Sequence, residues 1–429
     1  MPAKDAITNV WAREVLNFRG SPTVEAEVTL SDGSTGRGAV AAGVSAGSHE
    51  VGQLLDGDPK RFRGKGVLKA VDNVRNIIAP VLKGMRASDQ EAVDRRMLEL
   101  DGTPNKKRLG ANAILAVSIA SAQAAAASKK VPLYRHLGGD GPFRLPIPTY
   151  DILCGGSHAD EGVDFQEYLV IPVGVPTYEA ALRAGYDVYV TLWELLRKRG
   201  HRLRDWGGPL APSLGSNKEA MEVVMEAVEK AGYKLGEEVY VGIDAAMSEL
   251  YEDGKYVLKR DGRKLTSAEM ADLWVEWLGK YPIVSIEDAM SEDDWDAWQA
   301  LTKRIGNRVQ LVGDDFFTTN PERVRQGIQK KAANAVLIKP NQIGSISETL
   351  ETIRTACKAG WGAMVSARSG EPDDSTIADL AMFESTGQIK MGPPCRQCII
   401  KYNRLLRIAE GLGDRAEYAG HRAYRTWNR

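Results

Sequence analysis

Four apolar segments of this chain each end on a charged residue. The four residues are Asp244, Glu287, Asp314 and Lys339, and 43, 27 and 25 residues separate successive members. Such spacings are expected of strands separated by helices. In a (βα) barrel the strand ends meet at one rim, where essentially every barrel enzyme has its active site. The pattern therefore predicts an α/β barrel in which three carboxylates and a lysine lie close together.

The chain is long enough for a barrel and a second domain, since it has 429 residues. We expect a smaller α+β capping domain over residues 1–135 and a (βα)8 barrel over residues 142–429. Alternating and helical patterns support the first domain at residues 21–30, 33–41, 66–83 and 111–129. The glycine-containing residues 43–58 are interpreted either as a lid over a neighbouring site or as an ordinary connector.

Charge and composition favour a small-molecule ligand. Lys and Arg number 56 and Asp and Glu 57, so there is no basic excess to favour a nucleic-acid or membrane partner. The N-terminus lacks a signal-like apolar core, and residues 111–128 are too rich in Ala and Ser for a confident membrane span. Four cysteines are too few for a disulfide framework, and Cys395 and Cys398 have no second pair to complete a zinc site. We expect a soluble, cytoplasmic protein with ordinary thiols.

A repeat of strands and helices follows the proline-containing stretch 141–150. Strands are predicted near residues 168–172, 239–244, 283–287, 309–314, 335–339, 363–366 and 388–390. Helices fit between them, with Ser or Asn available to cap their starts, at residues 217–232, 267–280, 320–331 and 345–360.

The three acids suit a magnesium ion. Asp244, Glu287 and Asp314 offer hard oxygen ligands at successive strand ends, as Mg²⁺ prefers. The alternative is that each acid caps a helix or pairs with a base. A metal beside Lys339 would lower the pKa of its ammonium group and allow it to act as a base, whereas a plain salt bridge to the acids is the competing interpretation.

The chain resembles the enolase family along almost its whole length. The resemblance is carried by RGSPTVEAEV, GKGVLKAVDNV, RLGANAILAVS, GGSHAD, DFQEYLVIP, IDAAMSELY, SIEDAMSEDDW, LVGDDFFTTNP, IKPNQIGSISE, RSGEPDD, GQIKMGPPCR and KYNRLLRIAE. It implies an enolase-type barrel behind an α+β domain. It also implies a lysine or histidine base that works with one or two Mg²⁺ ions, and a homodimer or higher homo-oligomer.

The resemblance also implies roles for individual residues. Asp244, Glu287 and Asp314 look like the ligands of the tighter Mg²⁺, and Ser45 matches a loop serine that helps to hold a second one. Lys339 looks like the lysine that removes the proton next to the substrate carboxylate. The remaining matches are Lys390 as the contact of that carboxylate, Arg368 and Ser369 as the phosphate-binding pair, and His158, Gln166 and Glu167 as a mobile-loop histidine and the acid/base region.

The chain departs from the family at the residues that expel hydroxide. Where enolases have Gly-Asp-Glu-Gly-Gly, the sequence is Arg-Asp-Trp-Gly-Gly, so that Trp206 replaces the acidic residue. An indole cannot donate a carboxyl proton, and Asp205 is the alternative acid. The histidine before the phosphate-binding arginine is Ala367. Further departures are Ala46 in the loop, Asn17-Phe18, and the segment Arg396-Gln397-Cys398-Ile399.

These departures favour three hypotheses. The first is an enzyme similar to the enolase-like carboxyphosphonoenolpyruvate synthases of phosphinate natural-product pathways, which join a nucleotide-activated phosphonoformate to an enolpyruvyl unit. There a cytidine nucleotide conjugate is the second ligand, and Ala367 makes room. Trp206 either offers a stacking face for the nucleobase or packs under its loop as core. The second hypothesis is a divergent phosphopyruvate hydratase that dehydrates 2-phosphoglycerate slowly, because losing one general acid costs about 10²–10⁴-fold in rate. The third is a catalytically silent binding or structural protein.

Overall fold

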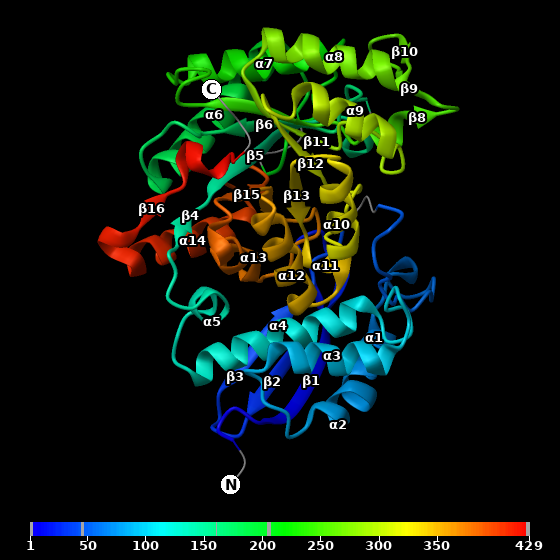
Figure 1. Ribbon diagram of the computed structural model, residues 1–429, viewed down its shortest axis with the longest axis vertical. Helices are drawn as coiled ribbons and strands as arrows, with labels where there is room; N and C mark the ends of the chain where they lie inside the picture. The colour runs from blue at the N-terminus through cyan, green and yellow to red at the C-terminus, as the bar shows by residue number, and fades with distance from the viewer. Residues whose placement is uncertain (1–2, 44–46, 160, 204–206, 426–429) are drawn as a thin grey trace.

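The structure, a computed structural model, describes residues 3–43, 47–159, 161–203 and 207–425. An antiparallel sheet of order β1-β2-β3 opens the chain and helices cover it (Figure 1). Its elements are β1 (Ile7–Leu16), β2 (Pro22–Leu30), β3 (Thr35–Ala39), α1 (Leu68–Asn73), α2 (Ala79–Leu82), α3 (Gln90–Asp101), α4 (Ala111–Ser128) and α5 (Leu133–Gly138). Strands were predicted at residues 21–30 and 33–41 and helices at 66–83 and 111–129, and the structure has them there. Strand β1 was not predicted.

Helix α4 is the core helix of this domain. It is apolar enough by length and composition to cross a membrane, but 83% of it is buried inside the protein. The helix packs directly on the β3 backbone, because a Cβ at Gly36 would lie 2.1 Å from the backbone nitrogen of Ala124 and one at Gly38 would lie 2.5 Å from the Cβ of Ile119. These two glycines are required by the close approach.

A closed barrel of eight strands forms the rest of the fold, in the order β11-β12-β13-β14-β15-β5-β6-β7. The strands are β5 (Ile147–Cys154), β6 (Glu167–Ile171), β7 (Tyr240–Asp244), β11 (Ile283–Glu287), β12 (Gln310–Gly313), β13 (Ala335–Ile338), β14 (Gly362–Ser366) and β15 (Gln388–Met391). All seven predicted strands are present. The expected uniform repeat was wrong at its start, because β5 precedes these strands with only a short 3-10 helix, and no α-helix, after it, and because β6 runs antiparallel to both neighbours.

Helices surround the barrel (Figure 1). They are α6 (Tyr178–Lys198), α7 (Asn217–Lys230), α8 (Ser267–Lys280), α9 (Trp295–Ile305), α10 (Pro321–Lys330), α11 (Pro340–Ile343), α12 (Ile346–Lys358), α13 (Thr376–Leu380) and α14 (Cys398–Leu412). Short strands β8 (Tyr251–Glu252), β9 (Lys255–Leu258) and β10 (Arg263–Leu265) form a side sheet, and β4 (Arg144–Leu145) pairs with β16 (Glu417–Tyr418).

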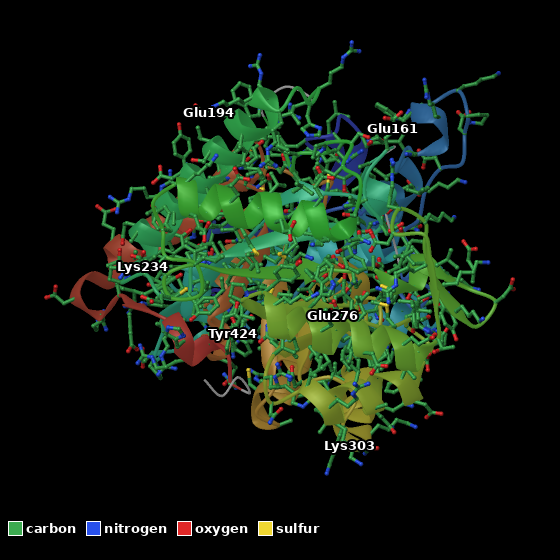
Figure 2. The ribbon with its side chains drawn as sticks, turned by 90° about the horizontal axis from the view of Figure 1, so that it is seen from above. Glu161, Glu194, Lys234, Glu276, Lys303 and Tyr424 are labelled. Carbon is green, nitrogen blue, oxygen red and sulfur yellow. The ribbon has the colours of Figure 1, made fainter. Side chains whose placement is uncertain are left out.

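Polar side chains cap the N-termini of several of these helices, and charged side chains lie on their outer faces. Asn320 and Ser345 cap α10 and α12 as predicted, whereas α7 and α8 are capped one residue earlier than expected, by Ser216 and Thr266. Charged side chains project from the outer faces, and Figure 2 shows Lys303 of α9 at the edge of the molecule.

The N-terminal domain is fastened to helix α12 by buried polar contacts. The backbone nitrogen of Ile346 donates to Ser118 Oγ at 2.9 Å, and that of Ser347 donates to Asp94 Oδ2 at 2.9 Å. Lys106 also forms a 3.0 Å ion pair with Glu348. The start of α12 therefore has its free N–H groups satisfied partly by the other domain.

His136 on α5 is expected to make the fold sensitive to acid. Its Nδ1 is buried without a hydrogen-bond partner among the residues described, and burial, with a smaller effect of Lys129, lowers the pKa of the imidazole to about 4. The folded state thus binds fewer protons than the unfolded state below pH 6.5, and stability is lost as pH falls from there towards 4. In circular dichroism melts, His136→Gln should lose less Tm than the wild type between pH 7 and pH 5. Equal losses would contradict this role.

Candidate active site

The predicted charged residues meet at one rim of the barrel. Asp244 and Glu287 are the last residues of β7 and β11, and Asp314 and Lys339 directly follow β12 and β13. Glu167 reaches the same rim because β6 is antiparallel, which places its first residue opposite Asp244. This is the rim where barrel enzymes bind their substrates.

Lys390 of β15 lies at the centre of three acids. Its Nζ is 2.8 Å from Glu167 Oε2, 2.9 Å from Asp244 Oδ2 and 2.6 Å from Glu287 Oε2. All four side chains are nearly buried. Burial alone would lower the pKa of Lys390, but Asp244, Glu167 and Glu287 together raise it well above its usual value. The ammonium group therefore stays charged and balances the acids.

Asp314 is held by a second lysine. Its Oδ2 forms a short ion pair with Lys339 Nζ, and Gln342 Nε2 donates to its Oδ1 at 2.8 Å. Burial alone would lower the pKa of Lys339, but the charge of Asp314 outweighs burial and raises it. This direction is opposite to the lowering that the sequence predicted for a neighbouring metal charge, because in this arrangement the ammonium group is paired with a carboxylate. The lowering stays a prediction for the metal-loaded site.

Arg368 is positioned from both domains. Its guanidinium Nη1 lies 3.1 Å from Glu50 Oε1, and Gln342 Nε2 also donates to that oxygen at 3.3 Å. Glu371 accepts the backbone N–H of Arg368 at 2.8 Å and forms a 2.9 Å ion pair with Lys401. Sequence reasoning missed Glu50, although it lies in the segment 43–58 that was interpreted as a lid or connector.

Comparison with known families identifies the chain. Residues 7–137 match the family model described as the enolase N-terminal domain, and residues 142–427 match that of the enolase C-terminal TIM barrel domain. The protein belongs to the enolase family. This confirms the resemblance and the predicted fold class, and it supports the interpretation of the rim as the active site of an enzyme.

The donor set of this enolase-family protein fits a divalent cation. Glu287 Oε1 is buried and has no hydrogen-bond partner among the residues described, while burial and the charge of Asp244 raise the pKa of its carboxyl group well above the usual value. Asp244 itself has a lowered pKa, because Lys390 and neighbouring hydrogen bonds outweigh its burial. A buried, unpartnered carboxylate oxygen beside two further carboxylates is suited to Mg²⁺.

A second set of carboxylates overlaps the predicted one. In the described part of the chain, oxygens of Asp288, Asp314 and Asp315 lie within 4.8 Å of one another. The two oxygens of Asp288, however, accept the backbone N–H groups of Asp314 and Asp315 at 2.9 and 3.0 Å. Asp288 is therefore occupied in shaping the loop after β12, and we retain Asp244, Glu287 and Asp314 as the predicted ligands.

The other predicted residues fall into three groups. His158 Nδ1 is 3.5 Å from Glu167 Oε1, and Gln166 Nε2 is 3.5 Å from Asp244 Oδ2, so both adjoin the acid cluster. Ser369 and Ala367 line the cavity beside Arg368. The predictions for Ser45, Asp205 and Trp206 lie outside the described residues.

The cavity at the rim is large and chemically mixed. Its volume is about 590 Å³, within the range of about 300–1,000 Å³ typical of ligand pockets. Several residues at which the chain departs from the enolase pattern line it, namely Phe18, Ala367, Arg396, Gln397 and Cys398. Cys398 contributes a neutral thiol, because burial raises its pKa to about 12. Sequence reasoning missed one further acidic lining residue, Asp151.

Proposed function

We propose that this protein is a Mg²⁺-dependent enolase-superfamily enzyme that acts on a phosphorylated three-carbon acid. More specifically, we propose that it is a carboxyphosphonoenolpyruvate synthase, which transfers phosphonoformate from a nucleotide conjugate to an enolpyruvyl unit. One observation carries the proposal. Residues that differ from the enolase pattern line the same cavity as the retained cations Lys339, Lys390 and Arg368, as expected when the anion-binding apparatus is kept and a second substrate is added.

The residues present suit such a transfer. An oxygen of the enolpyruvyl unit forms a bond to phosphorus while the bond from phosphorus to the nucleotide oxygen breaks, and the nucleoside monophosphate leaves. A phosphoryl group already on that oxygen is released to water as inorganic phosphate. Lys390 and Arg368 would bind the anionic groups, and Lys339 would hold the enolpyruvyl oxygen or carboxylate. Mg²⁺, when bound by Asp244, Glu287 and Asp314, would align the anions and neutralise their charge.

Slow dehydration of 2-phosphoglycerate is the second candidate. It is favoured by the retained base-like Lys339 and by Glu167, whose carboxylate lies at the rim and within 3.5 Å of His158. It is disfavoured by Ala367 and Trp206, which replace an imidazole and a carboxyl group of the enolase pattern. A leaving hydroxide needs a proton donor, and neither a methyl group nor an indole ring supplies one efficiently.

Phosphorus NMR distinguishes these functions. The purified protein is incubated with Mg²⁺ and either 2-phosphoglycerate or phosphoenolpyruvate, with and without CMP-activated phosphonoformate. A new ester signal of the carboxyphosphono group that needs the activated donor, together with CMP, supports the transferase. Phosphoenolpyruvate from 2-phosphoglycerate alone supports the hydratase. No change in any mixture contradicts both and favours a silent fold.

Arg396 is expected to bind the second substrate. It lines the cavity, and its side chain packs against the backbone of Gly207, where a Cβ would lie 1.8 Å from Arg396 Nε. A guanidinium group here can contact a phosphate of the nucleotide conjugate. Arg396→Ala should raise the KM for the activated donor about tenfold or more while leaving that for the acceptor within about twofold. Equal effects on both substrates would contradict this assignment.

A further inference from the structure

Asp151 is an acid of the cavity that no assigned role uses. It lies on β5 and lines the cavity, yet only 7% of it is exposed. The neighbouring Tyr150 points the other way, because its hydroxyl donates to the backbone oxygen of Ala181 on α6. Since side chains alternate along a strand, Asp151 faces the inside of the barrel.

One carboxyl oxygen of Asp151 has no partner among the residues that the structure describes. Its Oδ1 is buried, and no described residue donates a hydrogen bond to it or forms an ion pair with it. The charged groups that face it are Glu167 on β6, Asp244 on β7 and Lys390 on β15. Lys390 is already bonded to three other carboxylates. An ionised Asp151 would therefore be a buried charge without a partner of its own, next to charges of the same sign.

Protonation resolves this conflict. Burial raises the pKa of Asp151 well above its usual value, and the charge of Glu167 raises it further. These effects outweigh the opposing charge of Lys390 and favour the neutral carboxylic acid, which has one hydroxyl proton to donate. Carboxylic acids that are kept neutral in this way act as hydrogen-bond donors in other active sites.

We propose that Asp151 is a ligand-binding residue that donates a hydrogen bond from its neutral carboxyl group to an oxygen of the anionic group lying against Lys390. This inference rests on the proposed function only in requiring an anionic three-carbon acid in the cavity. A neutral donor adds a contact to such a ligand without adding a negative charge beside it. An ionised aspartate at the same position would repel it.

Titration calorimetry of the full-length protein with Mg²⁺ and phosphoenolpyruvate tests the inference. Asp151→Asn keeps the size and an N–H donor, so its Kd should stay within about threefold of the wild type. Asp151→Leu keeps the volume but has no donor, so its Kd should rise about 10- to 100-fold, as for a lost hydrogen bond to a charged group. Wild-type affinity should also fall more steeply than that of Asp151→Asn as pH is raised above neutrality.

The outcomes are separable. Unchanged binding by Asp151→Leu, with a Tm near that of the wild type, would overturn the donor role and leave the proposed function intact. Binding lost equally in both variants would overturn it too, because a carboxylate rather than a donor would then be required. Failure of the wild-type protein to bind phosphoenolpyruvate or 2-phosphoglycerate would overturn the proposed function together with this inference. If Asp151→Leu fails to fold, the comparison of pH profiles between the wild type and Asp151→Asn decides.

Discussion

Replacing Asp314 by alanine should abolish Mg²⁺-dependent turnover, with a loss of about 10³-fold or more. The change removes one of three predicted oxygen ligands and also the ion-pair partner of Lys339, whose ammonium group contacts Asp314 directly. Both effects act on groups that stabilise charge in the reaction, where the loss of a single interaction commonly costs about 10²–10³-fold. The measurements are initial rates over a Mg²⁺ titration and calorimetry of Mg²⁺ binding without substrate.

Asp315→Asn is the matched control for this variant. Asp315 is adjacent in sequence and shares the cluster of oxygens within 4.8 Å, but it is not among the predicted ligands. It should retain Mg²⁺ affinity within about tenfold, the lower end of what an outer-shell change costs. A large loss in Asp315→Asn with little change in Asp314→Ala would make Asp315 a metal ligand in place of Asp314. Unchanged activity in Asp314→Ala would refute the metal assignment.

The convergence of the charged residues was predictable because it follows from one local signal. Each of Asp244, Glu287, Asp314 and Lys339 ends a buried apolar run, and a parallel barrel takes all such ends to one rim. Glu167 and Lys390 needed the family resemblance instead. Glu167 begins its strand, and nothing local indicates that β6 is antiparallel and so brings a strand start to the active rim.

Other parts of the site could not be read from local patterns. Strand β5 carries Pro148 and overlaps the proline-containing stretch 141–150, so its strand signal is weak, and Asp151 was overlooked with it. Glu50 meets Arg368 across 318 positions of sequence, and no short-range pattern encodes such a pair. The ion pair with Asp314 that keeps Lys339 protonated likewise forms only because the fold brings the two side chains together. Local sequence patterns indicate which residues end the strands, whereas the protonation of those side chains depends on neighbouring residues that only the folded structure brings together.

Replacing Lys390 by methionine should destabilise the metal-free protein by about 3–5 kcal/mol. The variant keeps the buried carboxyl groups of Glu167, Asp244 and Glu287 but removes the ammonium group that lies within 2.9 Å of each. Removing one member of a buried ion cluster leaves uncompensated charge, which costs about this amount. An unfolding entropy of about 2.1 cal/mol/K per residue gives about 0.9 kcal/mol/K for this chain, so Tm should fall by about 3–6 °C.

Added Mg²⁺ should recover part of that loss, because a cation among Asp244, Glu287 and Asp314 offsets the same negative charge. Lys401→Met is the matched control: Lys401 is also buried and forms a 2.9 Å ion pair with Glu371, away from the predicted ligands. It should also be destabilised, but because it keeps all three predicted ligands its Tm should rise with Mg²⁺ only as much as that of the wild type, whereas the rise should be larger in Lys390→Met. Because burial and Asp244 already raise the pKa of Glu287, the folded Lys390→Met protein should take up protons readily, and its deficit should shrink as pH is lowered from 8 to 6. The absence of a Mg²⁺-induced rise in Tm in the wild type and in both variants, measured by calorimetric melts with EDTA as reference, would contradict a cation site at these carboxylates.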